Sequence, residues 1–408
     1  MKIDLLDPTN YSYTQPYDQF RWLRENDPVH WHDEPNGKGF WALTRHAHVK
    51  EMETKSDVFA NEPTIVINDD MVFGDENHKH LLFEDPPGHT QHRRFFTVEL
   101  QPIPVRSQRE HLDELVTGVI DGVIERGECD LVEDLSGPLA SFVIADVMGI
   151  TRDEAQRLFP AAEILVRGIS ITDGPGAEAA AIVFEAAHRA FVDRKGNPTD
   201  DWMGRMANGG WDGHEDVDEL QFTLDFLLMV NGGSDTTRNL VATGMWELIK
   251  APSVYAELVA DPSLIPQAVE EMLRFNPPIV YQRRTATSDY ELGGKTIRKG
   301  DKVVGFYGAA NRDPEVFADP DVFDIRRSPN PHLAFGSGRH LCAGVHLARL
   351  ELAIMFRELI RRIPDMELAG PVGWYDYPDV PAGTGPTSMP IRFTPGVREG
   401  SQAASVPA

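Results

Sequence analysis

Apolar residues recur at every third or fourth position over much of the chain, and this spacing predicts a mainly helical protein. The pattern begins around residues 17–24 and extends through residues 107–196, where Leu112, Leu115 and Val116 fall on one helical face. A helix with such an apolar stripe must bury it against another element. We therefore expect several helices packed around a common core.

The longest predicted helix covers residues 217–250, and it is too polar to span a membrane. Gly232 and Gly233 lie in its middle, although each glycine costs about 1 kcal/mol relative to alanine. A Ser-Asp-Thr-Thr run containing Asp235 and Thr236 follows directly. Two glycines that destabilise the middle of a helix indicate that this segment serves a function. The alternative is that the polar side chains only satisfy carbonyl groups freed at a helix break.

Short stretches of alternating polarity predict strands beside the helices. Residues 28–32 and 39–44 alternate around a Pro-Asn-Gly turn, and residues 290–305 form a second strand-and-turn pattern. Residues 60–83 are irregular, and long segments of this kind are often functional. The expected fold class is therefore mainly α with small β-sheets (α+β).

Composition limits the classes of protein that the chain can represent. The 408 residues contain no internal linker or repeat, which predicts one domain over residues 1–399 and a disordered tail at 400–408. A net charge of −25 argues against nucleic-acid binding. The two cysteines form no disulfide framework, and the N-terminal residues resemble neither a signal peptide nor a spanning helix. We expect a cytoplasmic enzyme without a membrane span.

The most informative stretch surrounds Cys342. Gly336 and Gly338 precede this cysteine and Gly344 follows it. Because glycine has no side chain, the thiol is left open on both sides. Helical spacing resumes after Gly344, which places the sulfur just before a helix N-terminus and favours the thiolate. A thiolate in such a pocket is a metal ligand or a nucleophile.

Two other interpretations of this cysteine remain open on the residues alone. It could be a buried structural cysteine, or it could join His340 and His346 in a zinc site. The full stretch reads Phe335-Gly336-x-Gly338-x-His340-x-Cys342-x-Gly344. This ten-residue pattern resembles the haem-binding loop of the cytochrome P-450 family, in which the cysteine is the axial iron ligand. The resemblance implies haem b as cofactor, with Cys342, Phe335 and His340 at the haem site.

A second motif follows the family's order. The stretch Gly232-Gly-Ser-Asp235-Thr236 resembles the family's oxygen-binding motif, with Gly232 in place of the usual alanine. The resemblance implies that Gly232 and Gly233 leave room for dioxygen. It also implies that Thr236 and Asp235 are catalytic residues that deliver protons.

Three further positions resemble the family's contacts to the haem propionates. His89 and Arg93 lie four residues apart on one face of a predicted helix, where they could also be an ordinary exposed basic face. Arg284 matches the family's propionate-binding arginine. Together with His340, these residues would offset the charge of the two propionates.

Glu271 and Arg274 stand three apart on another predicted helix, a spacing that surface helices commonly show. In the family this pair is buried and joined by an arginine before the cysteine loop, a position that Arg327 matches. The resemblance therefore implies a structural triad of Glu271, Arg274 and Arg327 that supports the cysteine loop.

The resemblance covers residues from about 17 to 395 and implies the cytochrome P-450 fold, with haem between the long central helix and the cysteine loop. It implies a monooxygenase that inserts one atom of dioxygen into a C–H bond of a bulky hydrophobic molecule, a terpenoid or steroid. The alternatives are a fatty-acid hydroxylase of the same fold, or a non-catalytic haem sensor or carrier.

Electrons would come from a separate ferredoxin and ferredoxin reductase. We expect His92, Arg93, Arg94 and Arg339 to form a basic patch for an acidic ferredoxin. The resemblance also implies that residues 60–83 and the helix-loop-helix around residues 164–177 close over the substrate.

Overall fold

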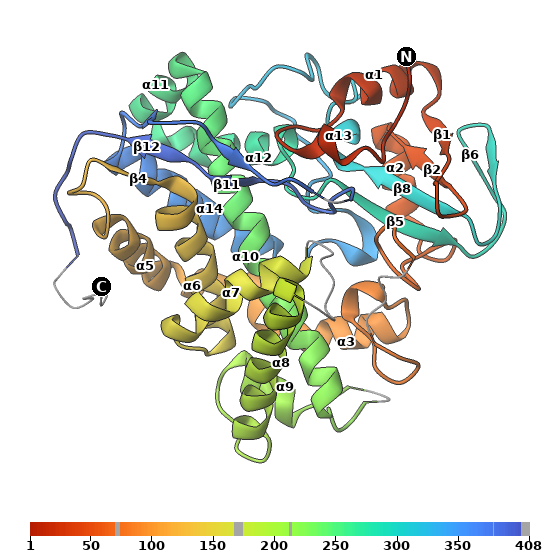
Figure 1. Cartoon of the computed structure of the whole chain (residues 1–408), viewed down its shortest axis with the longest axis horizontal. Helices are drawn as coiled ribbons and strands as arrows, with labels where there is room; N and C mark the ends of the chain where they lie inside the picture. Colours follow the sequence, from red (N-terminus) through yellow and green to blue (C-terminus); the bar gives the residue numbers. More distant parts are fainter. Residues whose placement is uncertain (70–73, 167–173, 212–213, 378, 401–408) are drawn as a thin grey trace.

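The computed structural model describes residues 1–69, 74–166, 174–211, 214–377 and 379–400 (Figure 1). Residues 401–408 of the predicted tail, most of the apolar run before residue 174 and part of the irregular segment 60–83 lie outside the described residues. The single domain over residues 1–399 stays a prediction.

α-Helices are the main regular elements of the described chain, as the apolar spacing predicts. They are α1 (Tyr17–Asn26), α2 (His46–Thr54), α3 (Gly88–Phe96), α4 (Pro102–Ser107), α5 (Arg109–Asp121), α6 (Gly137–Met148), α7 (Arg152–Val166), α8 (Gly174–Arg194), α9 (Trp202–Asn208), α10 (Glu219–Lys250), α11 (Pro252–Ala260), α12 (Ile265–Phe275), α13 (Tyr307–Ala310) and α14 (Val345–Arg362).

The strands form four small sheets in the described chain, and the largest lies at the end of the molecule where α1 and α2 pack (Figure 1). The five-stranded sheet has the order β1 (Val29–His32), β2 (Phe40–Leu43), β8 (Lys302–Phe306), β5 (Tyr281–Ala286) and β3 (Phe59–Ala60). The other strands are β4 (Glu128–Asp130), β6 (Tyr290–Leu292), β7 (Lys295–Ile297), β9 (Glu367–Leu368), β10 (Gly373–Trp374), β11 (Pro386–Ser388) and β12 (Pro390–Arg392). The two predicted strand-and-turn patterns are confirmed: β1 and β2 are antiparallel, and so are β6 and β7. The parallel pairing of β2 with β8 was not predicted from the sequence.

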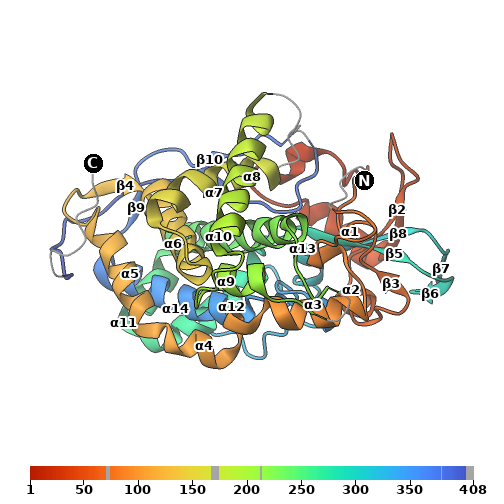
Figure 2. The same ribbon diagram turned by 90° about the horizontal axis from the view of Figure 1, so that it is seen from below.

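The helix α10 crosses the centre of the molecule (Figure 1). It lies between α8 on one side and α3, α4 and α14 on the other (Figure 2). Its first turn begins after Asp218, whose carboxylate accepts a hydrogen bond of 3.0 Å from the backbone of Gln221. The helix continues without a break through Gly232 and Gly233. The expected helix break is therefore absent, although the hydroxyls of Ser234 and Thr236 do donate to backbone carbonyl groups one turn earlier.

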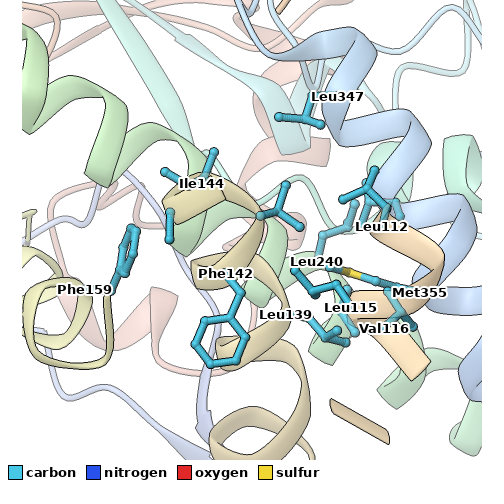
Figure 3. Packing of buried hydrophobic residues seen from close by; sticks show 14 of the residues in the cluster. Leu112, Leu115, Val116, Leu139, Phe142, Ile144, Phe159, Leu240, Leu347 and Met355 are labelled. Carbon is cyan, nitrogen blue, oxygen red and sulfur yellow. The ribbon is translucent and has the colours of Figure 1, made fainter. Parts of the chain in front are cut away.

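The largest hydrophobic core joins α5, α6, α10 and α14 (Figure 3). Leu112 and Leu115 of α5 are nearly inaccessible, as the sequence pattern predicts. They lie beside Leu240 of α10 and Met355 of α14 in Figure 3. This packing fixes α14, which begins just after the cysteine loop, against the central helix α10. The core therefore sets the position of Cys342 relative to α10.

Candidate active site

A cavity of about 1480 Å³, part of which is open to solvent, lies between α10 and the cysteine loop. It is lined by most of the site residues expected from the sequence, namely His89, Arg93, Gly232, Gly233, Thr236, Arg284, Phe335, His340 and Cys342. The structure thus brings residues from four separate parts of the chain to one space.

The cysteine loop is shaped by glycines in the left-handed region. Gly336 has φ of 68° and Gly338 has φ of 71°. A Cβ atom on Gly338 would lie 2.5 Å from the carbonyl oxygen of Glu53, so only glycine fits there. The backbone N–H of Cys342 donates to the carbonyl of Phe335 at 2.8 Å, which closes the loop below the thiol.

The thiol of Cys342 lies three residues before α14 and faces the cavity. Burial raises the pKa of Cys342, whereas the backbone N–H of Gly344 and the charges of Arg93 and Arg349 act in the opposite direction. These donors and cations favour a thiolate that is bound to a metal cation. The loop therefore fits an axial ligand to haem iron.

Two imidazoles of the cavity wall have buried nitrogens that suit a ligand. The rings of His89 and His340 have centroids 3.9 Å apart. His89 Nδ1 and His340 Nε2 have no hydrogen-bond partner among the described residues. Burial and the nearby charge of Arg93 lower the pKa of His89 to about 4. A bound carboxylate would give both nitrogens a partner.

Two arginines stand beside these imidazoles. Arg93 donates to the carbonyl of Leu341, next to the cysteine. Arg284 is 2% exposed and donates to the Arg283 carbonyl at 2.8 Å and to Gln282 Oε1 at 3.1 Å. A buried and a half-buried cation next to unsatisfied imidazoles are a suitable site for the two carboxylates of a haem.

The neighbouring glycines of α10 have different surroundings, although both line the cavity. A Cβ atom on Gly232 would meet only Leu228, at 3.9 Å. A Cβ atom on Gly233 would lie 2.1 Å from the side chain of Ile144 in α6. Gly232 therefore leaves space in the cavity, whereas Gly233 allows α6 and α10 to approach each other.

Thr236 and Asp235 face different cavities. Thr236 lines the cavity with Cys342, and its hydroxyl donates to the Gly232 carbonyl at 3.1 Å. Asp235 lines a second, smaller cavity, part of which is open to solvent. Its carboxylate accepts hydrogen bonds from Arg238 at 2.8 Å and Asn239 at 3.1 Å. The structure therefore does not bring Asp235 into the cavity that contains Cys342.

Comparisons with known proteins decide the family. The sequence pattern of the family Cytochrome P450 matches residues 206–363. The Steroid C26-monooxygenase of Mycolicibacterium smegmatis is 34% identical, covering 96% of this chain and 96% of that protein. The chain belongs to the cytochrome P450 family. The Linalool 8-monooxygenase of Pseudomonas putida is 32% identical, covering 90% of this chain and 93% of that protein.

The fold of this P450 agrees with its solved relatives. A Mycobacterium marinum cytochrome P450 in complex with pseudoionone superimposes with a TM-score of 0.84 and 32% identity, covering 92% of this chain and 94% of that one.

The protein is a cytochrome P450 monooxygenase, and its cofactor is haem. The family implies an organic substrate, dioxygen and redox partners. The relatives do not support a non-catalytic haem carrier. Within the described residues, no helix is long and apolar enough to cross a membrane.

The zinc site considered for this P450 is not formed. In the part of the chain that the structure describes, no three His, Cys, Asp or Glu side chains are grouped to hold a metal ion. His340 and Cys342 therefore do not form a zinc site with His346. Cys342 alone would suffice as the protein's ligand to haem iron.

Glu351 is a cavity residue that the sequence reasoning missed. It lies on α14, lines the cavity and accepts a hydrogen bond from the hydroxyl of Thr237. Burial raises the pKa of Glu351 to about 8, and its Oε2 has no partner among the described residues. The sequence signal for this residue was a carboxylate within the largely apolar stretch of residues 347–356.

Glu271 is the centre of a buried ion cluster. It accepts from Arg274 at 2.7 and 2.8 Å and from Arg327 at 3.2 Å, and Glu271 and Arg274 are 0% exposed. Asn330, which the sequence reasoning missed, donates to Glu271 at 3.1 Å. The structure thus brings the three residues expected for the triad together, next to the segment that enters the cysteine loop.

His92 does not lie on the surface with the other basic residues. Arg94 and Arg339 are exposed, but His92 is completely buried. The expected basic patch therefore lacks His92, because this side chain points from α3 toward α10 rather than toward solvent.

Proposed function

We propose that this P450 hydroxylates a bulky, apolar small molecule of the terpenoid or steroid class. The observation that carries the proposal is the apolar wall of the large cavity beside Cys342. This wall includes Leu82, Phe96, Leu100, Ile144, Leu228 and Met229. A wall of this kind provides burial but few hydrogen-bonding groups. Relatives named for a steroid and for linalool support the same class.

In this proposal Cys342 Sγ ligates the haem iron. His89, Arg93, Arg284 and His340 would hold the two propionates, because all four line the cavity and the two imidazoles offer buried nitrogens without a partner among the described residues. When bound, haem supplies the chemistry that activates dioxygen and inserts one oxygen atom into a C–H bond.

Phe335 and the two glycines of α10 would contact the cofactor from opposite sides. Phe335 begins the cysteine loop, and Gly232 and Gly233 lie on the facing surface of α10. The absence of a side chain at Gly232 leaves the space in which dioxygen and substrate meet.

Thr236 is proposed to hold a proton for transfer at its Oγ1 atom, because a hydroxyl can accept and donate a hydrogen bond. Asp235 would supply that proton from the second cavity. Its carboxylate is bound to Arg238, so it must rotate away from this partner to reach the Thr236 side of the helix. Arg238 is itself paired with Glu163, which can retain the arginine during such a rotation.

Spectral titration of the purified haem protein with a panel of compounds tests the substrate class. Steroids and terpenoids are expected to displace water from the iron and to change the spin state at micromolar concentrations. Fatty acids of matched size serve as the comparison. A spin-state change with fatty acids alone would replace the proposed class with the fatty-acid alternative.

A further inference from the structure

His92 occupies an unusual environment at the contact between α3 and α10. The side chain is 0% exposed. Its Nδ1 atom lies 2.9 Å from Glu84 Oε2, and its Nε2 atom lies 2.9 Å from Asp225 Oδ1. The ring stacks on Trp211, with centroids 4.1 Å apart and planes within 5°. We call His92, Glu84 and Asp225 the His92 clamp.

The geometry of the His92 clamp requires a charged imidazole. Each ring nitrogen faces a carboxylate oxygen, and only the imidazolium has two N–H donors. In a neutral ring, one nitrogen lone pair would face a buried carboxylate, which would lose its donor. Stacking on an indole also favours the cation.

The surroundings are shaped to hold both carboxylates. Gln221 donates to the second oxygen of Asp225 at 3.3 Å. A Cβ atom on Gly88 would lie 2.3 Å from Glu84 Oε1, so the missing side chain makes room for this carboxylate. Neighbouring residues therefore accommodate both carboxylates of the His92 clamp at the contact between α3 and α10.

The elements that the clamp joins also form the walls of the active site. On α3, the neighbours His89, Arg93 and Phe96 line the cavity. On α10, Met229 lines the cavity one turn after Asp225. We propose that His92 is a positioning residue for the haem site: its imidazolium holds α3 against α10, and this contact weakens when His92 loses its proton. This inference rests on the roles proposed above for His89 and Arg93.

The direction of the pH effect follows from the charges around His92. Burial alone lowers the pKa of His92, but the charges and hydrogen bonds of Asp225 and Glu84 raise it to about 9. The stabilising contribution is complete below the ordinary value of 6.5 and is lost as the pH rises through about 9. Burial keeps the pKa of neighbouring His80 at about 3 and of His89 at about 4, so both are neutral throughout this range.

The rate of haem transfer from the intact holoenzyme to excess apomyoglobin measures how firmly the His92 clamp holds the haem site together. For the wild-type protein we expect slow transfer that does not change with pH up to about pH 8, and a rise in the rate through about pH 9. Far-UV circular dichroism recorded on the same samples should stay constant over this range. A transfer rate that stays flat to about pH 10 would overturn the inference.

The isosteric variant Asp225→Asn separates positioning from simple structural support. Loss of one carboxylate lowers the pKa of His92, so the rise in haem transfer should move down by at least about one pH unit. At about pH 8 the variant should then lose haem about tenfold faster than the wild type. An unchanged pH profile in Asp225→Asn would contradict the inference, even if the protein were less stable overall.

Two more variants complete the design. His111→Gln removes an exposed imidazole that lies 2.6 Å from Asp146, and it should leave the pH profile of haem transfer unchanged. Arg93→Ala tests the propionate assignment by itself. Faster transfer at all pH values, with the rise near pH 9 retained, would support that assignment, and a wild-type rate would remove Arg93 from it without altering the result for Asp225→Asn.

Discussion

Gly232 and Gly233 show how two identical residues in one helix turn can serve different purposes. A Cβ atom is tolerated sterically at Gly232 but would overlap Ile144 at Gly233. Helix propensity alone favours alanine over glycine by about 1 kcal/mol at either position. The structure therefore predicts opposite signs for the same substitution at adjacent sites.

For Gly232→Ala we expect a protein about as stable as the wild type or up to about 1 kcal/mol more stable. For Gly233→Ala we expect a loss of about 1–3 kcal/mol, because α6 and α10 must move apart. Chemical unfolding followed by far-UV circular dichroism measures both values. Gly233→Ala should cost less in an Ile144→Ala background than in the wild type, because the side chain that it overlaps is shortened. Equal stability of the Gly232→Ala and Gly233→Ala variants would contradict this explanation.

Thr236 is the residue whose replacement tests proton delivery. We predict that Thr236→Ala keeps haem and substrate binding but diverts reducing equivalents into peroxide, because the hydroxyl at the cavity wall is lost. The ratio of hydroxylated product to reductant consumed should fall by roughly tenfold or more. Thr236→Ser, which keeps the hydroxyl, is the matched control. An unchanged ratio of product to reductant in Thr236→Ala would remove this residue from the mechanism.

At the scale of elements, the Glu271 cluster joins α12 to the segment before the cysteine loop. Arg274 also donates to the carbonyl groups of Asn311, Pro320 and Val322, so it organises this segment directly. Glu271→Ala or Arg274→Ala leaves a buried charge without its partner and should cost about 3–5 kcal/mol. Purified yield and haem content measure the effect, and normally folded, haem-loaded variants would show that the cluster is dispensable.

The elements that the sequence predicted well are those with local signals. The helix at 219–250, the glycine-rich loop before Cys342 and the paired strands depend on neighbours in the sequence. Glu351 and His92 could not be placed, because their partners lie 114 and 133 residues away. The partners of Asp235 could not be foreseen either, because its direction depends on the hydrogen bonds that it accepts from Arg238 and Asn239.

At the scale of the whole molecule, a net charge of −25 coexists with exposed Arg94 on α3 and Arg339 in the cysteine loop. We propose that these arginines receive an acidic ferredoxin, itself reduced by a ferredoxin reductase. Reduction should therefore slow as the Debye length falls from about 10 Å to about 3 Å with added salt.

Arg94→Glu and Arg339→Glu should each slow reduction by about tenfold at low salt and weaken its salt dependence. Arg392→Glu is the control, because this exposed arginine lies on β12, away from α3 (Figure 1). Stopped-flow reduction by a candidate ferredoxin measures the rate. Equal rates for all three variants would argue against this docking face.

The central claim is that Cys342 binds haem iron as a thiolate, and the carbon monoxide complex of the reduced protein tests it most directly. Thiolate ligation predicts the red-shifted Soret band that distinguishes this ligand from histidine, and Cys342→His should abolish the shift while haem remains bound. A histidine-like Soret band in freshly prepared, undamaged wild-type protein would contradict the account.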